Sequence, residues 1–514
     1  MLRKDFSDKK RSGVLGMKKF FVKRWLPLCL GVIAALNMFA ATIEVNRNEL
    51  ESTDSSAVEF ESFGGPWQVI ETADAIRGIG GNLGSIIARN IAEASVAGSG
   101  EKYTLIHAVG DSQEGVQKFS ADILVINENA GVDHIKNLRR IISGYLENAY
   151  GYSREDADAL AVFITVYNAV YRGQIETFSA KYTDSVLRNL EQAKVGLSTN
   201  WQDWAGKSQI VIPLGEYSGM ATVETSVISD EKVIDVLKQD EDKNIEAREK
   251  LADIKERESQ SASQNAIKAQ REATEQRQQG NKEGAAQSAQ KATQQQQVAD
   301  RKSNEARTER ADIQKDNEII AEQKPVETIT GLFVEDEKKG FFRLITVESD
   351  SGKIVRRSPI TQIRSKAVYT VNDISVLNDE NQTEKFAQMY LAVCGTNDKR
   401  SAVRLCLIDP DTLEIKKQSE EILSGVSELI QNGNNFIAVI QDEKNYKAAI
   451  YDKNLTLIAK SDVTVKETTP LNITKKGLLV TSQSGSPVLL DETKLKEVWG
   501  QGKTKVHQND GLAK

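Results

Sequence analysis

Histidine and cysteine are scarce in this chain, and their scarcity limits the chemistry that it can carry. Its 514 residues include only three histidines and three cysteines. Metal sites built from imidazole and thiolate ligands need several such residues close together. Most sites of that kind are therefore excluded. No nucleophile–base pair stands out either, so we expect no cofactor and no catalytic residues.

An excess of positive charge is also lacking. The formal net charge is −7. Nucleic acids and anionic lipid surfaces attract proteins of net positive charge. We therefore expect neither of them as a partner.

Proline and aromatic residues are both absent from the stretch 229–324, which is dominated by Glu, Gln, Lys, Arg and Ala. These are good helix formers, and no proline ring interrupts them, so the stretch is predicted to be helical. Its second half repeats apolar residues every seven positions, which is typical of a left-handed supercoil. We expect the second track of the seam at residues 289, 296, 303 and 310. The repeated positions are Ala285, Ala292, Ala299, Ala306, Ile313 and Ile320.

The heptad phase changes around Gly280–Gly284, where glycines and Asn281 are typical stop and start signals for helices. The stretch is therefore either a helical hairpin or one long rod with a weak point. A charged linker that is only partly helical is the third alternative. Alanine buries little surface, so the seam favours at most weak self-association.

Residues 1–41 have the pattern of an export signal. Four basic residues between 18 and 24 precede the apolar run 26–36, and small residues follow it. The apolar run is shorter than the ~20 residues that span a bilayer. Met17 is an alternative start. We expect an exported protein without a transmembrane segment after cleavage, in the periplasm or associated with the outer membrane.

Residues 42–228 are predicted to form a compact α+β domain, with three strands identified by β-type alternation and three helices by apolar spacing. Ser153 is expected to cap the second helix. The strands are predicted at 103–109, 119–127 and 209–214, and the helices at 137–150, 153–171 and 174–192.

Several polar or glycine-rich features of this domain could be mistaken for active-site motifs. The stretch Gly78–Gly84 lacks the preceding strand and the following lysine of a phosphate loop, so we expect a flexible turn between helical pieces. His107 and His134 are expected to be structural hydrogen-bonding groups. The carboxylates between 155 and 158 lie at a helix start, where they complement the helix dipole.

Three segments of this domain resemble a known family. They are Asn137–Leu146 (NLRRIISGYL), Ile164–Gly173 (ITVYNAVYRG) and Trp204–Leu214 (WAGKSQIVIPL). Together they look like the amino-terminal domain of the spirochaete 83/100-kDa antigen family, best known from Borrelia. The order of parts is similar too: export signal, this domain, a charged coiled middle and a β-rich end. The resemblance implies an antigen of the cell envelope, and it supplies no catalytic residues.

Residues 326–500 are predicted to form an all-β, propeller-like domain. Short strands end in Asp409, Asp452 and Asp491, each followed by a tight turn, and this spacing is close to one propeller blade. A β-sandwich is the alternative. These aspartates are expected to bond their own turns rather than Ca²⁺. Cys394 and Cys406 flank one turn on adjacent strands, so two alternatives are open for them: two buried thiols, or a disulfide across the two strands. The tail 501–514 is expected to be disordered.

The fold class predicted for the whole chain is therefore an α+β domain (42–228), a helical coiled-coil spacer (229–324) and a β-repeat domain (326–500). We expect a non-enzymatic envelope protein, an interaction or structural scaffold that binds protein partners of the envelope. One alternative is a ligand- or glycan-binding protein that works through the β-rich domain. Another is a hydrolase with its site in the α+β domain.

Overall fold

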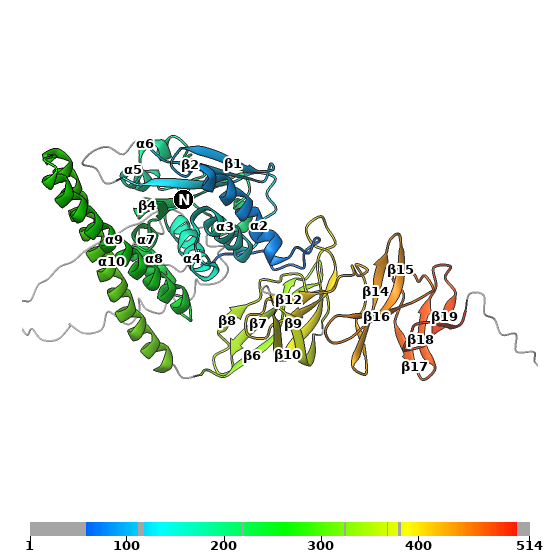
Figure 1. Ribbon diagram of the computed structural model, residues 1–514. Helices are drawn as coiled ribbons and strands as arrows, with labels where there is room; N and C mark the ends of the chain where they lie inside the picture. The colour runs from blue at the N-terminus through cyan, green and yellow to red at the C-terminus, as the bar shows by residue number, and fades with distance from the viewer. Residues whose placement is uncertain are drawn as a thin grey trace, which may run out of the picture. The chain divides into compact units, whose positions relative to one another are not determined.

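The structure is a computed structural model that describes residues 58–110, 118–217, 220–322, 325–366, 368–378 and 382–500. The predicted export signal (1–41) and the predicted disordered tail (501–514) lie outside these ranges. The three predicted parts appear as an α+β region, a long helical stretch and a β-rich region (Figure 1).

A five-stranded antiparallel sheet, with its strands in sequence order, lies in the α+β region. Its register aligns Leu105 with Leu124 and Leu124 with Ile210, all fully buried, so one face of the sheet forms a continuous apolar layer. The predicted strands are confirmed, with two more at the edges. The strands are β1 (Ser95–Ser99), β2 (Tyr103–Ala108), β3 (Ser120–Ile126), β4 (Ser208–Tyr217) and β5 (Met220–Val223).

Helices pack against this sheet, and two of them confirm the predicted apolar spacing. Ser153 caps α4 as predicted, because its hydroxyl accepts a hydrogen bond from the backbone N–H of Asp156 at 3.2 Å. The helices are α2 (Ala73–Ile87), α3 (Ile135–Tyr150), α4 (Arg154–Val170), α5 (Ile175–Lys181), α6 (Asp184–Leu187), α7 (Thr225–Ile228) and α8 (Glu231–Leu237), with 3₁₀ turns at Ala88–Asn90 and Trp201–Asp203.

The prediction of a single helix at 174–192 is wrong, because two shorter helices, α5 and α6, lie in this range. Between them the backbone at Tyr182 is extended and forms a bridge with Phe119. The N–H of Phe119 donates to Lys181 O, and the N–H of Thr183 donates to Phe119 O. These hydrogen bonds to another segment replace the helical ones, an effect that apolar spacing does not reveal.

The flexible turn predicted at Gly78–Gly84 is also wrong, because these residues lie inside α2. A Cβ atom built on Gly80 would come within 1.8 Å of Ile141 O in α3, and one on Gly144 of α3 within 2.1 Å of Arg77 O. The glycines therefore let the backbones of α2 and α3 touch. Close helix packing requires the same residue type as a turn, and the sequence pattern alone does not separate the two.

The helical stretch is a hairpin of two long antiparallel helices, α9 (Ile245–Gln278) and α10 (Lys282–Glu322) (Figure 1). Arg310 pairs with Asp253 near one end, and Ser288 donates to Gln276 near the other. The helices are separated at Gly280, whose φ of +79° is unstrained only for glycine. The break predicted at these glycines is confirmed.

The alanine seam is confirmed on α10, but its second track is not where we predicted. Ala285, Ala292, Ala299 and Ala306 are buried. The companion track begins at Ser288, one residue earlier than predicted, and includes buried Lys302 and Asp316. Its members contact α9, as in the Ser288–Gln276 and Arg248–Asp316 hydrogen bonds, and it carries charged residues that apolar spacing does not detect.

The buried core of the α+β region does not end at the predicted boundary of residue 228. Val233 and Leu237 of α8 belong to it, and so do Leu251 and Ile254 of α9. The first turns of the hairpin are thus part of the same core.

The β-rich region consists of one three-stranded and three four-stranded antiparallel sheets in sequence order. The strands are β6 (Thr328–Asp336), β7 (Phe341–Glu348), β8 (Ile354–Arg357), β9 (Tyr369–Leu377), β10 (Thr383–Cys394), β11 (Arg404–Ile408), β12 (Ile415–Gln418), β13 (Ile430–Asn432), β14 (Asn435–Asp442), β15 (Asn445–Tyr451), β16 (Leu457–Lys460), β17 (Asn472–Thr474), β18 (Gly477–Thr481), β19 (Pro487–Leu490) and β20 (Glu497–Trp499).

Successive sheets stack through alternate residues of their strands. In β14, Phe436 and Ala438 join one apolar cluster, while Ile437 and Val439 join the next. A closed propeller is not found among the residues that the structure describes, since no strand of the first sheet pairs with one of the last. Phe333 on the first sheet and Trp499 on the last are 47% and 42% exposed, so these end sheets lack the second partner that closure would supply.

The repeated aspartate turns are confirmed. Oδ1 of Asp409, Asp452 and Asp491 accepts a backbone N–H two residues on, at 2.8, 2.9 and 3.1 Å. Leu413 and its equivalents Leu455 and Leu495 follow in the left-handed region, with φ between +54° and +62°. Their side chains are buried, which compensates for this backbone conformation.

Candidate functional site

The helical hairpin is fastened to the α+β region by a buried cluster of charges. Lys302 of α10 is fully buried, and its Nζ donates to Glu224 Oε1 at 2.6 Å and to Thr225 Oγ1 at 2.7 Å. It also pairs with Glu258 Oε2 of α9 at 3.1 Å. One ammonium group therefore joins the segment after β5 to both helices of the hairpin.

The two carboxylates around Lys302 differ in acidity. Burial acts to raise the pKa of Glu224, but the charge of Lys302 and its hydrogen bond outweigh this and lower it. Burial raises the pKa of Glu258 in spite of the same ammonium group, and the neighbouring Glu224 adds to the rise. Glu224 is thus the ionised partner of Lys302, and Glu258 takes up a proton more readily.

Two further cations continue the cluster along the hairpin. Arg248 of α9 is fully buried and bonds Glu309 at 2.5 Å and Asp316 at 2.7 Å. Lys255 pairs with Glu305 at 2.9 Å. We call these groups together the ion-pair row. Its members are Arg248, Lys255, Lys302, Glu224, Glu258, Glu305, Glu309 and Asp316.

The ion-pair row was missed by the sequence analysis, although the sequence does contain a signal for it. Lys302, Glu309 and Asp316 each lie three residues after a heptad position of α10. Charged residues at such positions are unusual in a supercoil, and they indicate a specific partner. In the distal half of the hairpin the buried residues are instead alanines, from Ala262 to Ala273 in α9 and from Ala285 to Ala299 in α10.

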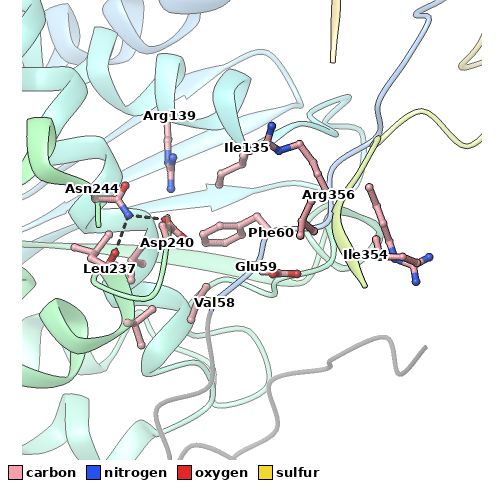
Figure 2. Close-up of a pocket in the computed structure, with 14 residues that line it drawn as sticks. Val58, Glu59, Phe60, Ile135, Arg139, Leu237, Asp240, Asn244, Ile354 and Arg356 are labelled. Carbon is pink, nitrogen blue, oxygen red and sulfur yellow. Dashed lines mark hydrogen bonds between the residues drawn. The ribbon is translucent and has the colours of Figure 1, made fainter. Parts of the chain in front are cut away.

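A cavity of about 550 Å³ lies beside Arg139, between α3, α8 and strand β8 (Figure 2). Its apolar walls include Phe60, Val166 and Leu237. The guanidinium of Arg139 and the carboxylate of Asp240 face the space from opposite sides. Its lining is mixed, because Glu59, Asn244, Arg356 and Arg357 also line it, and its volume lies within the range of small-molecule sites.

The Arg139 side chain is held in place from within the α+β region. Its Nε–H donates to Thr165 Oγ1 at 3.1 Å, and its guanidinium lies 5.7 Å from the centre of the Phe60 ring. Burial lowers the pKa of Arg139 to about 10, against the attraction of Asp240. The guanidinium is therefore still cationic at neutral pH.

Asp240 is held by a different segment. Its Oδ2 accepts a hydrogen bond from Asn244 Nδ2 at 2.5 Å, and the same nitrogen donates to Leu237 O at 3.0 Å. Burial raises the pKa of Asp240, while Asn244 and Arg139 act against that rise. Arg139, Asp240 and Phe60 come from three separate stretches, so no local motif could have predicted this cavity.

The predicted disulfide residues Cys394 and Cys406 are both buried and free in the structure. The register sets Cys394 opposite Arg404 and Cys406 opposite Ala392, so the two cysteines lie diagonally across β10 and β11. Burial and the adjacent Cys394 thiol raise the pKa of Cys406. The thiolate is thus disfavoured, and pairing of the two cysteines stays a prediction.

His107 belongs to a hydrogen-bond network in which it, Asp122 and Tyr145 are buried. Its Nδ1 lies 2.5 Å from Asp122 Oδ1, and its Nε2 lies 2.9 Å from Ile91 O. Tyr145 and Tyr150 both donate to the other carboxylate oxygen of Asp122. A carbonyl can only accept, so Nε2 carries a proton. Burial acts to lower the pKa of His107, but Asp122 outweighs it, so the pKa is raised.

The His107–Asp122 pair is expected to make stability fall as pH rises. Because the folded pKa lies above the unfolded value of ~6.5, this stability is present in full below that pH and is lost as pH rises through the folded pKa. Urea unfolding between pH 5 and 9 should show the fall, with a slope of up to about 1.4 kcal/mol per pH unit. His107→Gln should be less stable and should lose this slope. An unchanged slope in that variant would contradict the assignment.

His134→Gln provides the matched control. Nδ1 of His134 accepts the N–H of Lys136 at the start of α3, so this histidine is a helix cap. Burial lowers its pKa to about 4. A lowered pKa changes stability between about pH 4 and 6.5 and not above that range. The slope in the alkaline range should therefore survive in this variant.

The carboxylates at the start of α4 bind neighbouring helices. Asp158 accepts two hydrogen bonds from Arg77 of α2, and Asp156 pairs with Arg257 of α9 at 2.7 Å. Among the residues that the structure describes, no group of three or more His, Cys, Asp or Glu side chains is arranged to hold a metal ion. No described helix is both long enough and apolar enough to cross a membrane.

Comparison with known proteins gives one family. The family model described as Borrelia P83/100 protein matches residues 47–328 and 262–471, which is most of the chain. A search of curated proteins finds no match.

Proposed function

The chain belongs to the Borrelia P83/100 protein family, and from that premise we propose that it is an exported, non-enzymatic scaffold protein of the cell envelope. In this proposal the helical hairpin is the arm that meets a protein partner. The family resemblance supports the envelope location and the antigen-like character. The β-rich region, as a row of stacked sheets, supplies a second surface.

The observation that carries the proposal is the ion-pair row. In a flexible linker the side chains of Lys302 and Arg248 would be solvated, whereas here they are buried with their carboxylates. Buried charge pairs contribute little net stability but are costly to break, so they hold one arrangement in preference to others. The row therefore supports a hairpin whose base has a fixed direction, while the buried residues of its distal half are alanines.

Contacts between the α+β region and the β-rich region support the same proposal. Arg400 pairs with Asp133 at 2.9 Å, and Trp67 Nε1 donates to the other oxygen of Asp133 at 3.2 Å. Arg404 donates to the carbonyl oxygens of Trp67 and Gln68. These contacts join the two regions directly, so a scaffold role does not require the hairpin to act as a spacer between them.

Shortening the arm is expected to remove its partner without unfolding the protein. Deleting 263–276 from α9 and 285–298 from α10 takes two heptads from each helix and keeps the glycine turn and the ion-pair row. Cross-linking mass spectrometry on intact cells should then lose the neighbours that cross-link to the arm. Neighbours of the β-rich region should stay, which makes them the internal control.

Two outcomes would contradict the scaffold proposal. One is an intact protein without reproducible protein neighbours. The other is a short-arm variant that keeps every neighbour of the full-length arm. Thermal unfolding of the short-arm variant must first show a midpoint close to that of the parent chain, since its core and ion-pair row are unchanged.

A further inference from the structure

We propose that the cavity beside Arg139 binds a small zwitterionic ligand, with the ligand's carboxylate on Arg139 and its ammonium group on Asp240. The ligand class is an apolar amino acid or a short peptide that carries both charged termini. This site is independent of the hairpin and of the scaffold role.

The Arg139 side chain has N–H donors that are available to a ligand. Its Nε–H is occupied by Thr165, whose own hydroxyl donates to Ala161 O at 2.9 Å. Within the described residues, neither Nη group of Arg139 forms a hydrogen bond or ion pair. Two parallel N–H groups of a guanidinium match the two oxygens of a carboxylate. The guanidinium is thus oriented in advance and still has its bidentate edge available.

Arg139 and Asp240 bring opposite charges to the lining of the cavity. Asp240 is held by Asn244, and in the described part of the chain it forms no ion pair with a lysine or arginine. Arg139 and Asp240 face each other without being bonded (Figure 2). A ligand with both charges would neutralise both groups at once. A phosphate would satisfy Arg139 but would bring its further negative charge towards Asp240.

The cavity also has an apolar surface beside these two charges. Val166, Val236 and Leu237 provide an apolar wall there, and the volume is about 550 Å³. That volume lies within the common range for small-molecule sites. Arg356, which also lines the cavity, pairs with Glu241 at 2.9 Å. A ligand that carries both charged groups and packs an apolar side chain against this wall fits this arrangement.

Titration calorimetry on the purified protein tests the proposal with a panel that separates the two charges. L-Leucine and the dipeptide Ala-Leu carry both groups, and binding of either one supports the site. N-acetyl-leucine lacks the ammonium group, leucinamide lacks the carboxylate, and inorganic phosphate is the simple anion. Each charged contact should account for about 10- to 100-fold in affinity, so the last three should bind that much more weakly than leucine or Ala-Leu.

Two variants assign the contacts. Arg139→Met should weaken leucine binding about 10- to 100-fold, and Asp240→Asn should do the same. Asp240→Asn should leave the weak binding of N-acetyl-leucine unchanged, because that ligand has no ammonium group. Asp235→Asn is the matched control, since this exposed residue of α8, five positions before Asp240, carries the same charge and does not line the cavity.

The proposal is overturned if no member of the panel binds, or if leucinamide or phosphate binds as tightly as leucine. It is also overturned if Asp240→Asn and Asp235→Asn behave alike towards leucine. Asp240 is exposed, so its variant tests the site even if Arg139→Met lowers the stability of the fold.

Discussion

Replacing Lys302 with methionine is expected to lower the free energy of unfolding by about 3–5 kcal/mol. The change leaves Glu224 and Glu258 buried beside each other without the ammonium group that lies 2.6 and 3.1 Å away. Removing one member of a buried ion pair costs more than the pair contributes, because the remaining charge has lost its partner. Urea unfolding followed by circular dichroism measures the difference.

Two comparisons make the Lys302 prediction specific. Lys315→Met on the same helix removes a side chain that is 71% exposed and, within the described residues, pairs only with Asp312, so a loss below about 1 kcal/mol is expected. The triple variant Lys302→Met, Glu224→Gln, Glu258→Gln removes the charges together and should regain much of the loss. Equal losses for Lys302→Met and Lys315→Met would show that the ion-pair row does not hold the hairpin.

Replacing Gly80 with valine is expected to destabilise the protein by about 3 kcal/mol or more. Its Cβ would overlap the carbonyl oxygen of Ile141, and a backbone atom cannot move aside as a flexible side chain can. Helices α2 and α3 would have to separate along their contact. The thermal midpoint and the free energy of unfolding both measure this loss.

Gly78→Ala is the matched control, and it is expected to change the stability in the opposite direction. Gly78 lies in the same helix, is exposed, and has no atom within 4 Å of its built Cβ. Alanine there removes the entropy cost of a helical glycine and should stabilise the protein by about 0.5–1 kcal/mol. If both variants changed the stability in the same direction, the close contact of α2 and α3 would not be the reason for glycine at position 80.

The elements that the sequence predicted well are those whose pattern is local. Alternation identified β2 and β3, and the glycines near residue 280 marked the break of the hairpin, because strand faces and helix ends depend on neighbouring residues. The heptad alanines became the seam for the same reason. The blade-like repeat was also local, since each aspartate bonds its own turn, whereas closure into a ring depends on sheets that are distant in sequence.

The parts that were missed depend on contacts between distant segments. Extended backbone at Tyr182 exists because Phe119 pairs with it. Lys302 is buried because Glu224 lies opposite it, 78 residues earlier in the chain. The cavity combines Phe60, Arg139 and Asp240, none of which belongs to a motif with another. Apolar periodicity contains no information about such partners, so only the structure could show them.

Because α9 and α10 run antiparallel, the length of the arm does not affect the positions of its two ends. Those ends stay together because Arg248, near the start of α9, bonds Asp316, near the end of α10. Adding one heptad to each helix would extend the tip by about 10 Å at 1.5 Å per residue and would leave the base unchanged. Insertions and deletions made in matched pairs can thus change the length of the arm freely during evolution, while the globular parts keep their geometry.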